Sequence, residues 1–409
     1  MEHSVNIYNK ERRIELLSPA GNMDRLKTAF LYGADACYIG GREFSLRANA
    51  KNFSNDEIRE AVNYSHSLGK KIYVTVNIVF HNENVEGVTD YLKFLADVNV
   101  DAIIVSDPFI IDLVNDNDIK IPIHISTQYS VLNMEATLFF KELGVERVVL
   151  AREASRENIK NIIDKTGMEV ETFVHGAMCS SYSGRCVLSN YFTNRDANRG
   201  GCAQVCRWEF DLYDRDRHKI DADTKFTMST KDLAMIDNIG DMIDIGISSL
   251  KVEGRMRSDY YVATVINTYK SAINDYYDGK LTSERKDYYK KVLARVSNRD
   301  NTEQFYNHLP SVNEQYYLGR QEESNQDFLG VVLDYDEKTG FAKIEERNFF
   351  KKGDMVEFFG PNISVFSFQM GNIYNEDGEI LECARHPKEV IFFKVPQKVY
   401  QNDILRIKI

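Results

Sequence analysis

Short apolar runs rich in β-branched residues recur along the first 252 residues, and amphipathic segments separate most of them. The runs lie at 14–17, 36–39, 72–76, 102–105, 121–125, 147–150, 170–174 and 247–252. Helical spacing occurs at 23–32, 55–68, 85–97, 134–143 and 156–165, with glycine as a C-terminal cap at positions 33, 69, 144 and 167. Continuously apolar strands alternating with helices are typical of a parallel sheet covered on both faces. Eight such strands predict a TIM-like (β/α)8 barrel, with a doubly wound open sheet as the alternative.

The pattern changes after residue 255. Segments 260–277 and 283–296 are helical in spacing, the second of them basic, and 297–327 is polar and irregular, as in a linker. Alternating strands follow at 329–335, 341–345, 355–359, 365–370, 390–395 and 404–409, which predicts a small C-terminal β-barrel. The expected organisation is therefore a TIM-like barrel at 1–255, a helical and linker region at 256–327, and a small β-barrel at 328–409.

Composition and charge indicate an intracellular protein. The chain has 409 residues, of which 43% are apolar, and no run approaches the roughly 20 apolar residues of a membrane helix. The first residues lack the apolar core of a secretory signal. We therefore expect a cytoplasmic protein with no membrane partner and with reduced cysteines. The net charge of −11 argues against extensive coating by nucleic acid but leaves room for a local basic patch.

Polar or glycine-rich residues follow the predicted strands. In a TIM barrel these positions meet at one rim, which is where such proteins bind ligands. The candidate substrate-binding residues at this rim are Asn77, Gln128, His175, Lys251, Glu253 and Arg255. The alternative is that strand ends are polar only because they leave the core. The two histidines at strand ends, His124 and His175, have a structural role as their alternative.

Four of the six cysteines lie within 28 residues, at Cys179, Cys186, Cys202 and Cys206. They fall in the segment of about 176–224 that follows the seventh predicted strand, which is much longer than an ordinary βα connection. Four thiolates brought together in an intracellular chain most often hold a metal. The spacing lacks the CxxC pairs of structural zinc knuckles, and zinc remains the alternative metal.

The same segment is locally basic. Between 185 and 207 it carries Arg185, Arg195, Arg199 and Arg207 against one acidic residue, Asp196. A guanidinium binds phosphate or carboxylate through two parallel hydrogen bonds, so these arginines are candidate RNA contacts. A solvated loop held by salt bridges is the alternative.

The segment from Glu171 to Ser189 fills every fixed position of the pattern E-x-F-x-x-G-A-M-C-x-x-x-x-G-x-C-x-L-S. Supporting segments are ELLSPAG at 15–21, GADACYIGG at 33–41, REFSLR at 42–47, STQ at 126–128, CAQVCR at 202–207, KDL at 231–233, LKVEGR at 250–255 and FKKGD at 350–354. Together they resemble the collagenase-like peptidase family of unknown catalytic type over residues 15–409.

The resemblance carries expectations about function. The chain is most similar to family members that form 5-hydroxyuridine at the wobble base of tRNA in a prephenate-dependent reaction. Other members hydroxylate a ribosomal RNA cytidine or a ubiquinone precursor. The resemblance implies a [4Fe–4S] cluster held by the four clustered cysteines, a small dicarboxylate bound through Arg255, Arg47 or Lys251, and a tRNA anticodon region as partner. It also implies a paralogous subunit or a homodimer.

Two other classes of function stay open. One is a protease of extended chains, which would depend on Cys179 or His175; the other is a non-catalytic RNA-binding scaffold with a structural metal. Amide hydrolysis needs an activated nucleophile or a metal-bound water. The sequence contains no HExxH, GxSxG, P-loop or strand-linked GxGxxG motif and no recognisable nucleophile–base pair.

Overall fold

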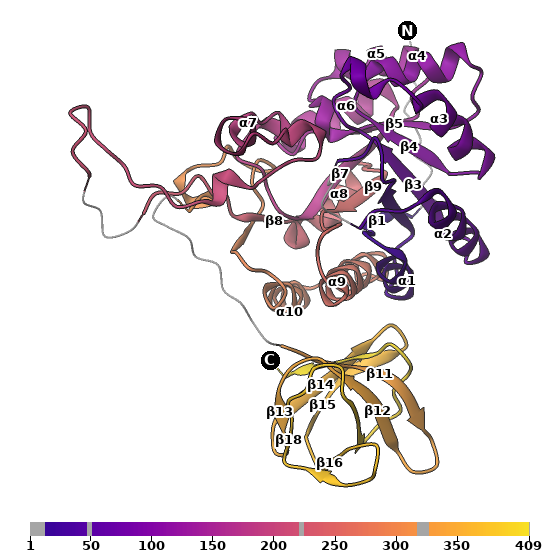
Figure 1. Cartoon of the computed structure of the whole chain (residues 1–409), viewed down its shortest axis with the longest axis vertical. Helices are drawn as coiled ribbons and strands as arrows, with labels where there is room; N and C mark the ends of the chain where they lie inside the picture. Colours follow the sequence, from indigo (N-terminus) through magenta and orange to yellow (C-terminus); the bar gives the residue numbers. More distant parts are fainter. Residues whose placement is uncertain (1–12, 47–50, 221–224, 317–326, 409) are drawn as a thin grey trace. The chain divides into compact units, whose positions relative to one another are not determined.

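The computed structural model describes residues 13–46, 51–220, 225–316 and 327–408. They belong to two compact units, Met1–Glu322 and Glu323–Ile409. Figure 1 shows a group of strands surrounded by helices in the first unit, and the second unit is built of strands. Within the described ranges, no helix combines the length and apolarity that crossing a membrane requires.

Eight parallel strands form the centre of the first unit. They are β1 (Glu15–Pro19), β2 (Ala36–Gly40), β3 (Lys71–Val76), β4 (Ala102–Val105), β5 (Ile123–Ile125), β6 (Arg147–Val149), β7 (Glu169–Gly176) and β9 (Ser249–Val252). Leu250 of β9 lies opposite Leu16 of β1 on one side and Thr172 of β7 on the other, so the sheet is closed. The predicted (β/α)8 barrel is confirmed, and the open-sheet alternative is wrong.

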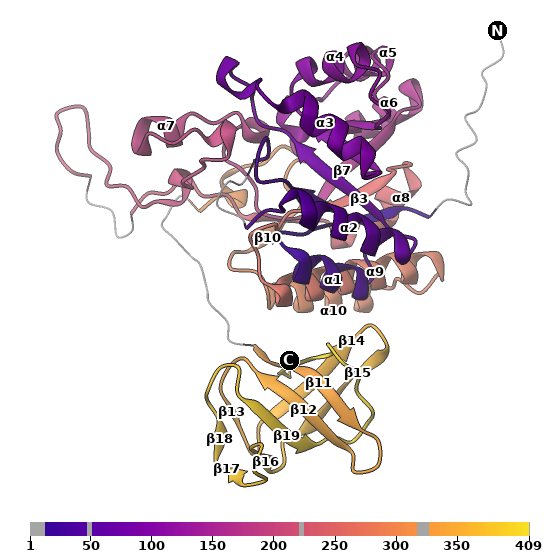
Figure 2. The same cartoon turned by 45° about the vertical axis from the view of Figure 1, so that its right-hand side comes forward.

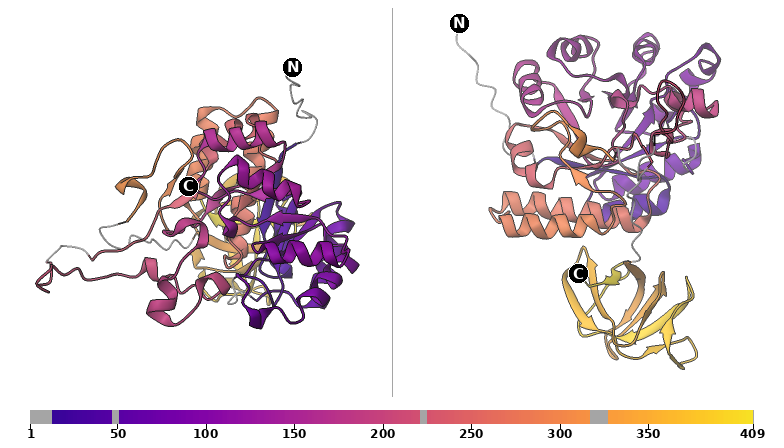
Figure 3. Two further views of the ribbon diagram at one scale, coloured as in Figure 1. Left: turned by 90° about the horizontal axis from the view of Figure 1, so that it is seen from above. Right: turned by 90° about the vertical axis from the view of Figure 1, so that its left-hand side faces the viewer.

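Helices cover the outside of this barrel (Figure 3). They are α1 (Met23–Leu31), α2 (Asn55–Ser67), α3 (Val88–Asp97), α4 (Pro108–Asp116), α5 (Met134–Glu142), α6 (Arg156–Thr166), α8 (Ile239–Asp244), α9 (Asp259–Tyr277) and α10 (Ser283–Ala294). The start of α2 is fixed by a capping box, because Ser54 accepts from the Glu57 N–H and Glu57 accepts from the Ser54 N–H. The four predicted C-terminal glycines all adopt positive φ, as a left-handed cap requires.

Several features differ from the sequence-based expectation. Strand β8 (Asp232–Ala234) pairs antiparallel with β7, and β10 (Asn301–Thr302) pairs with β8. These strands of three and two residues are too short to produce a periodic pattern. Helices α9 and α10, set apart from the barrel by the sequence pattern, lie in the first unit, where α9 packs on α1 and α10 on α9 (Figure 2). The expected linker contains β10 and a short turn at Val312–Glu314, and its residues 317–326 lie outside the described ones.

The second unit is an antiparallel β structure around its own apolar core, which includes Leu329, Phe358 and Phe393. Its main sheet has the strand order β15-β14-β20-β11-β12-β19-β16-β17, and β13 pairs with β18. The strands are β11 (Phe328–Asp336), β12 (Phe341–Glu346), β13 (Phe350–Lys351), β14 (Met355–Gly360), β15 (Ile363–Gln369), β16 (Ile373–Tyr374), β17 (Ile380–Leu381), β18 (Cys383–Ala384), β19 (Val390–Lys394) and β20 (Ile404–Ile407). The six predicted strands correspond to its six longer ones.

Candidate functional site

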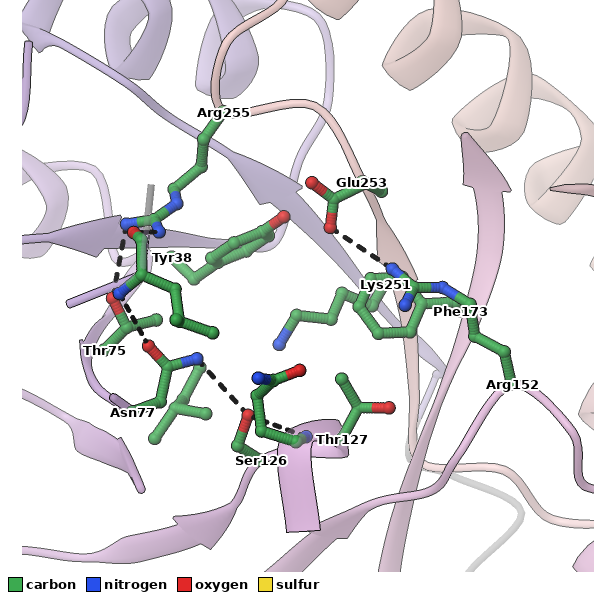
Figure 4. Close-up of a pocket in the computed structure, with 13 residues that line it drawn as sticks. Tyr38, Thr75, Asn77, Ser126, Thr127, Arg152, Phe173, Lys251, Glu253 and Arg255 are labelled. Carbon is green, nitrogen blue, oxygen red and sulfur yellow. Dashed lines mark hydrogen bonds and ion pairs between the residues drawn. The ribbon is translucent and has the colours of Figure 1, made fainter. Parts of the chain in front are cut away.

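A pocket opens at the carboxyl ends of the barrel strands (Figure 4). The space between its side chains measures about 520 Å³, counting the solvent at its mouth. Its lining combines apolar rings, hydroxyl and amide groups, and charges from most of the strands. The lining residues are Tyr38, Leu46, Thr75, Asn77, Ile104, Ser126, Thr127, Gln128, Arg152, Phe173, Lys251, Glu253 and Arg255. This is the location at which TIM barrels bind their ligands.

One side of the pocket is fixed by Arg255, which is 4% exposed. Its Nη1 donates to Ser45 Oγ at 2.9 Å and to Thr75 Oγ1 at 3.3 Å, and its Nη2 donates to the carbonyl of Leu46. A Cβ on Gly40 would lie 2.0 Å from Arg255 Nη1, so the guanidinium fits only because this strand end is glycine. The contacts of Arg255 with the protein indicate that it positions the rim.

Amide and hydroxyl groups continue the rim toward β5. Asn77 Oδ1 accepts from the Leu46 N–H at 3.2 Å, and its Nδ2 donates to Ser126 Oγ at 3.3 Å. The Gln128 N–H donates to the same Ser126 oxygen at 3.3 Å. These bonds hold polar groups from β3 and β5 at fixed positions where a ligand hydroxyl or carboxylate would meet them.

Two further cations reach the pocket. Figure 4 shows the Lys251 side chain pointing into the space between Arg255 and Arg152. Lys251 Nζ lies 4.5 Å from the centre of the Tyr38 ring, and the Arg152 guanidinium lies 3.7 Å from the centre of the Phe173 ring. Such contacts stabilise a cation while leaving part of its surface available to an anion.

Beneath the pocket, buried charges form a continuous layer inside the barrel. Glu171 is fully buried and accepts from Lys251 Nζ at 2.7 Å and from Arg147 Nη1 at 3.1 Å. Arg147 Nη1 also donates to Glu15 at 2.7 Å, and the Tyr73 hydroxyl donates to the other Glu15 oxygen at 2.7 Å. Burial opposes the charge of Arg147, but the two carboxylates prevail and raise its pKa well above the ordinary value. The layer therefore fixes the amine of Lys251 at the pocket floor.

The long segment between β7 and β8 is attached to this rim. The Ser183 N–H donates to Glu153 Oε1 at 2.8 Å, and the Arg152 N–H donates to Ser183 Oγ at 3.2 Å. Arg185 Nη2 donates to the carbonyl of Tyr129, two residues beyond the pocket-lining Thr127, at 3.0 Å. The segment contains the short elements η3 (Tyr182–Gly184), α7 (Leu188–Thr193), η4 (Ala197–Arg199) and η5 (Val205–Arg207).

This segment also carries the four clustered cysteines, none of which forms a disulfide. Burial raises the pKa of the Cys179 thiol, and the nearby thiols of Cys206 and Cys186 raise it further. Among the described residues no three or more ligand groups are arranged around a common metal position. The donor set itself, with Cys202 as the fourth thiol on the same segment, suits an iron–sulfur cluster or zinc. The thiols therefore fit such a centre by their chemistry, and no preformed cage is present among the described residues.

Comparison with known proteins identifies the relatives of this chain. Residues 21–316 match the model of peptidase family U32, and residues 324–406 match that of the peptidase family U32 C-terminal domain. The chain belongs to peptidase family U32. The resemblance to the collagenase-like peptidases is thereby confirmed.

Curated relatives of this U32 chain have names of two kinds, RNA hydroxylation proteins and a collagenase. It is 47% identical to the tRNA hydroxylation protein P1 of Bacillus subtilis, over 97% of this chain and 95% of that protein. It is 38% identical to the 23S rRNA 5-hydroxycytidine C2501 synthase of Escherichia coli, over 75% of this chain and 44% of that protein. It is 31% identical to a collagenase of Porphyromonas gingivalis, over 96% of this chain and 97% of that protein.

The family name raises the question of a nucleophile–base pair. His175 is buried outside the pocket lining, and its Nδ1 lies 3.4 Å from the Tyr269 hydroxyl. Burial, and then the charge of Arg257, lower the pKa of His175 to about 3. A base this weak does not take the proton from a thiol at neutral pH. His175, a candidate for substrate binding from the sequence, packs against aromatic rings in this U32 chain, and so does not support a dyad with Cys179.

The four candidate RNA-binding arginines have different surroundings. Arg199 forms an ion pair with Glu83 at 2.6 Å, and Arg185 is exposed but donates to the backbone. Arg207 is half-buried, and its pKa is lowered by that burial and then by nearby arginines. Arg195 is exposed. The basic patch is therefore part salt-bridged, as the alternative interpretation has it, and part accessible.

Five of the seven candidate substrate-binding residues lie together around the pocket: Asn77, Gln128, Lys251, Glu253 and Arg255. The sixth, His175, does not line the pocket, and the seventh, Arg47, lies outside the described residues. Sequence reasoning did not identify the rings of Tyr38 and Phe173 as pocket walls. It also did not identify the charged layer beneath, whose signal is a charged residue inside an otherwise apolar strand, as at positions 15, 147 and 171.

Proposed function

We propose that this chain is an RNA-modifying enzyme that hydroxylates the wobble uridine of tRNA to 5-hydroxyuridine. The observation that carries the proposal is the 47% identity to tRNA hydroxylation protein P1 over nearly the whole of both chains. The rRNA 5-hydroxycytidine synthase among the relatives supports the same reaction class, hydroxylation of a pyrimidine in RNA. Its substrate would be the anticodon region of tRNA, and its location the cytoplasm.

The pocket supports a small dicarboxylate such as prephenate as co-substrate. Its lining carries three cationic groups, Arg152, Lys251 and Arg255, against the carboxylate of Glu253. Lys251 and Arg152 are already paired with Glu171 and Glu253, so an anion that enters would compete with these carboxylates for the two cations. Apolar and aromatic walls would accept a ring, and the amide and hydroxyl groups would orient its polar substituents.

In this proposal Lys251 and Arg152 contact the carboxylates of the ligand. Arg152 is held by Glu253 at 3.3 Å, so a ligand carboxylate would share or replace that partner. Arg255 acts at a distance from the ligand charge, by keeping residues 45 and 46 in place. The side chains would thus bind and orient the ligand and exclude water from around it.

The four clustered cysteines would hold a [4Fe–4S] cluster, with zinc as the alternative. Such a cluster would supply electron transfer or would fix the segment at the rim. Broad absorption near 400 nm and bound iron in anaerobically purified protein would favour the cluster, and colourless protein with bound zinc would favour the alternative. A paralogous subunit or a second copy of this chain is a further proposed partner.

The experiment that tests the function is nucleoside mass spectrometry of total tRNA with and without the gene. We expect 5-hydroxyuridine and its derivatives to disappear on deletion, or on combined deletion of the gene and any paralogue. An unchanged nucleoside profile in the combined deletion would contradict the proposal. The collagenase relative makes proteolysis the competing function, which cleavage of gelatin by the pure protein would support.

A further inference from the structure

Exposed aromatic side chains gather on the cysteine-bearing segment. We call the group formed by Tyr191, Phe192, Trp208 and Phe210 the aromatic platform. Tyr191 is 84% exposed, Phe192 53% and Trp208 43%, and Phe210 is half-buried. The Phe192 ring meets those of Trp208 and Phe210 edge-on, with centres 6.3 and 5.8 Å apart. Figure 1 shows that α7, which carries Tyr191 and Phe192, lies apart from the helices that surround the barrel.

The platform is part of a small folded body. Helix α7 packs against η4 and η5, so the rings share a support with Cys202 and Cys206. The Ser189 hydroxyl of α7 accepts from the Ala203 N–H at 3.0 Å. A large ring that stays exposed on a folded support forgoes the stabilisation that burial would give it. Exposed rings that share one folded support in this way indicate a binding surface.

Charge indicates what the surface binds. Residues 185–210 hold four arginines against Asp196 and Glu209, a net charge of +2 in a chain whose total is −11. Arg195 follows α7 directly and is exposed, and Arg207 precedes Trp208. The Asp196 carboxylate accepts from the Asn198 N–H at 2.8 Å, which caps η4. Exposed rings interleaved with arginines are typical of surfaces that stack unpaired bases and contact their phosphates.

We infer that the aromatic platform binds single-stranded RNA by stacking the unpaired bases that flank the target nucleotide. The inference rests on the proposed function and adds to it the place where RNA is held. The platform lies on the same segment as η3, whose Ser183 is hydrogen-bonded to Arg152 and Glu153 at the pocket rim. A protein contact through the same rings is the competing occupant.

The chain provides its own reporter, because Trp208 is its only tryptophan. Purified full-length protein is titrated with a synthetic anticodon stem-loop whose wobble uridine is unmodified, and with a fully paired duplex of the same length. We expect the stem-loop to quench Trp208 fluorescence and the duplex to do so weakly. Loss of one stacked base costs about 1–3 kcal/mol. Tyr191→Ala should therefore raise the Kd for the stem-loop roughly 5- to 150-fold.

A matched control is Tyr288→Ala, which removes a 43% exposed tyrosine from α10 and should leave the Kd unchanged. Salt dependence separates stacking from charge. Arg195→Gln should lower the slope of log Kd against log salt by roughly 0.7, as expected for one lost contact to a single strand. Tyr191→Ala should weaken binding without changing that slope.

Three results would overturn the inference. If Tyr191→Ala binds the stem-loop as tightly as the wild type, the platform does not stack bases, although the proposed function would stand if deletion of the gene removes 5-hydroxyuridine from tRNA. If Tyr191→Ala changes the sedimentation coefficient of the protein but not its Kd for RNA, the rings contact another protein chain. If the wild-type protein binds no RNA but deletion of the gene still removes 5-hydroxyuridine from tRNA, the inference alone fails. If deletion of the gene leaves 5-hydroxyuridine unchanged, the proposed function fails with it.

Discussion

Glu171 is the residue on which the charged layer inside the barrel most depends. Its carboxylate has no exposed surface and accepts hydrogen bonds from two cations, Lys251 at 2.7 Å and Arg147 at 3.1 Å. Glu171→Gln keeps the shape but removes the charge, and an amide offers a single acceptor oxygen to two donors. Removing one member of a buried ion pair costs about 3–5 kcal/mol. We expect the free energy of unfolding of the first unit to fall by about that amount.

Urea unfolding followed by far-UV circular dichroism measures this change. The α-helices of the described residues all lie in the first unit, so the helical signal reports its unfolding. Glu169→Gln is the matched control: Glu169 is on the same strand and pairs with the same Arg147 at 2.8 Å, but its side chain is 32% exposed. It should cost less than about 1 kcal/mol. Equal losses in the two variants would refute the reasoning.

Other expected outcomes follow from single residues. His175 titrates near 3 when folded and has an ordinary pKa of 6.5, so unfolding takes up a proton and stability falls as the pH drops below 6.5. At about pH 5 this loss is about 2 kcal/mol, and His175→Gln should flatten that part of the pH dependence of the unfolding midpoint; an unchanged slope would show that His175 is not the cause. Lys251→Met should weaken binding of prephenate at least about tenfold in calorimetry, and unaltered affinity would remove Lys251 from the ligand site. Gly40→Ala should push the Arg255 guanidinium out of its hydrogen bonds and lower the free energy of unfolding by about 1–3 kcal/mol, and an unchanged thermal unfolding midpoint would contradict this.

Most of the fold could be predicted because its strands are buried on both faces. Every residue of β2 and β4 is buried, so these strands appear in the sequence as uninterrupted apolar runs. The strand pattern favours a closed barrel but leaves the open sheet as an alternative, because closure depends on the pairing of β9 with both β1 and β7. The same holds for β8 and β10, whose few residues take their conformation from neighbouring strands.

The candidate site could be predicted in part for a similar reason. A closed barrel brings its strand ends together, so polar residues after the strands, such as Asn77 and Gln128, meet at one pocket. The sequence could not indicate that Arg147 lies beside Glu15, 132 residues away, because that contact follows from strand register. It also could not separate His175, which turns toward Tyr269, from Lys251, which turns toward the pocket.

The most direct test of the account is the 5-hydroxyuridine content of tRNA in the deletion strain after complementation with matched variants of the full chain. Wild type and Glu169→Gln should restore the modified nucleoside. Lys251→Met and Cys186→Ala, produced at equal levels and folded, should not restore it. Full restoration by both Lys251→Met and Cys186→Ala would contradict the assignment of the pocket and of the clustered cysteines to RNA hydroxylation.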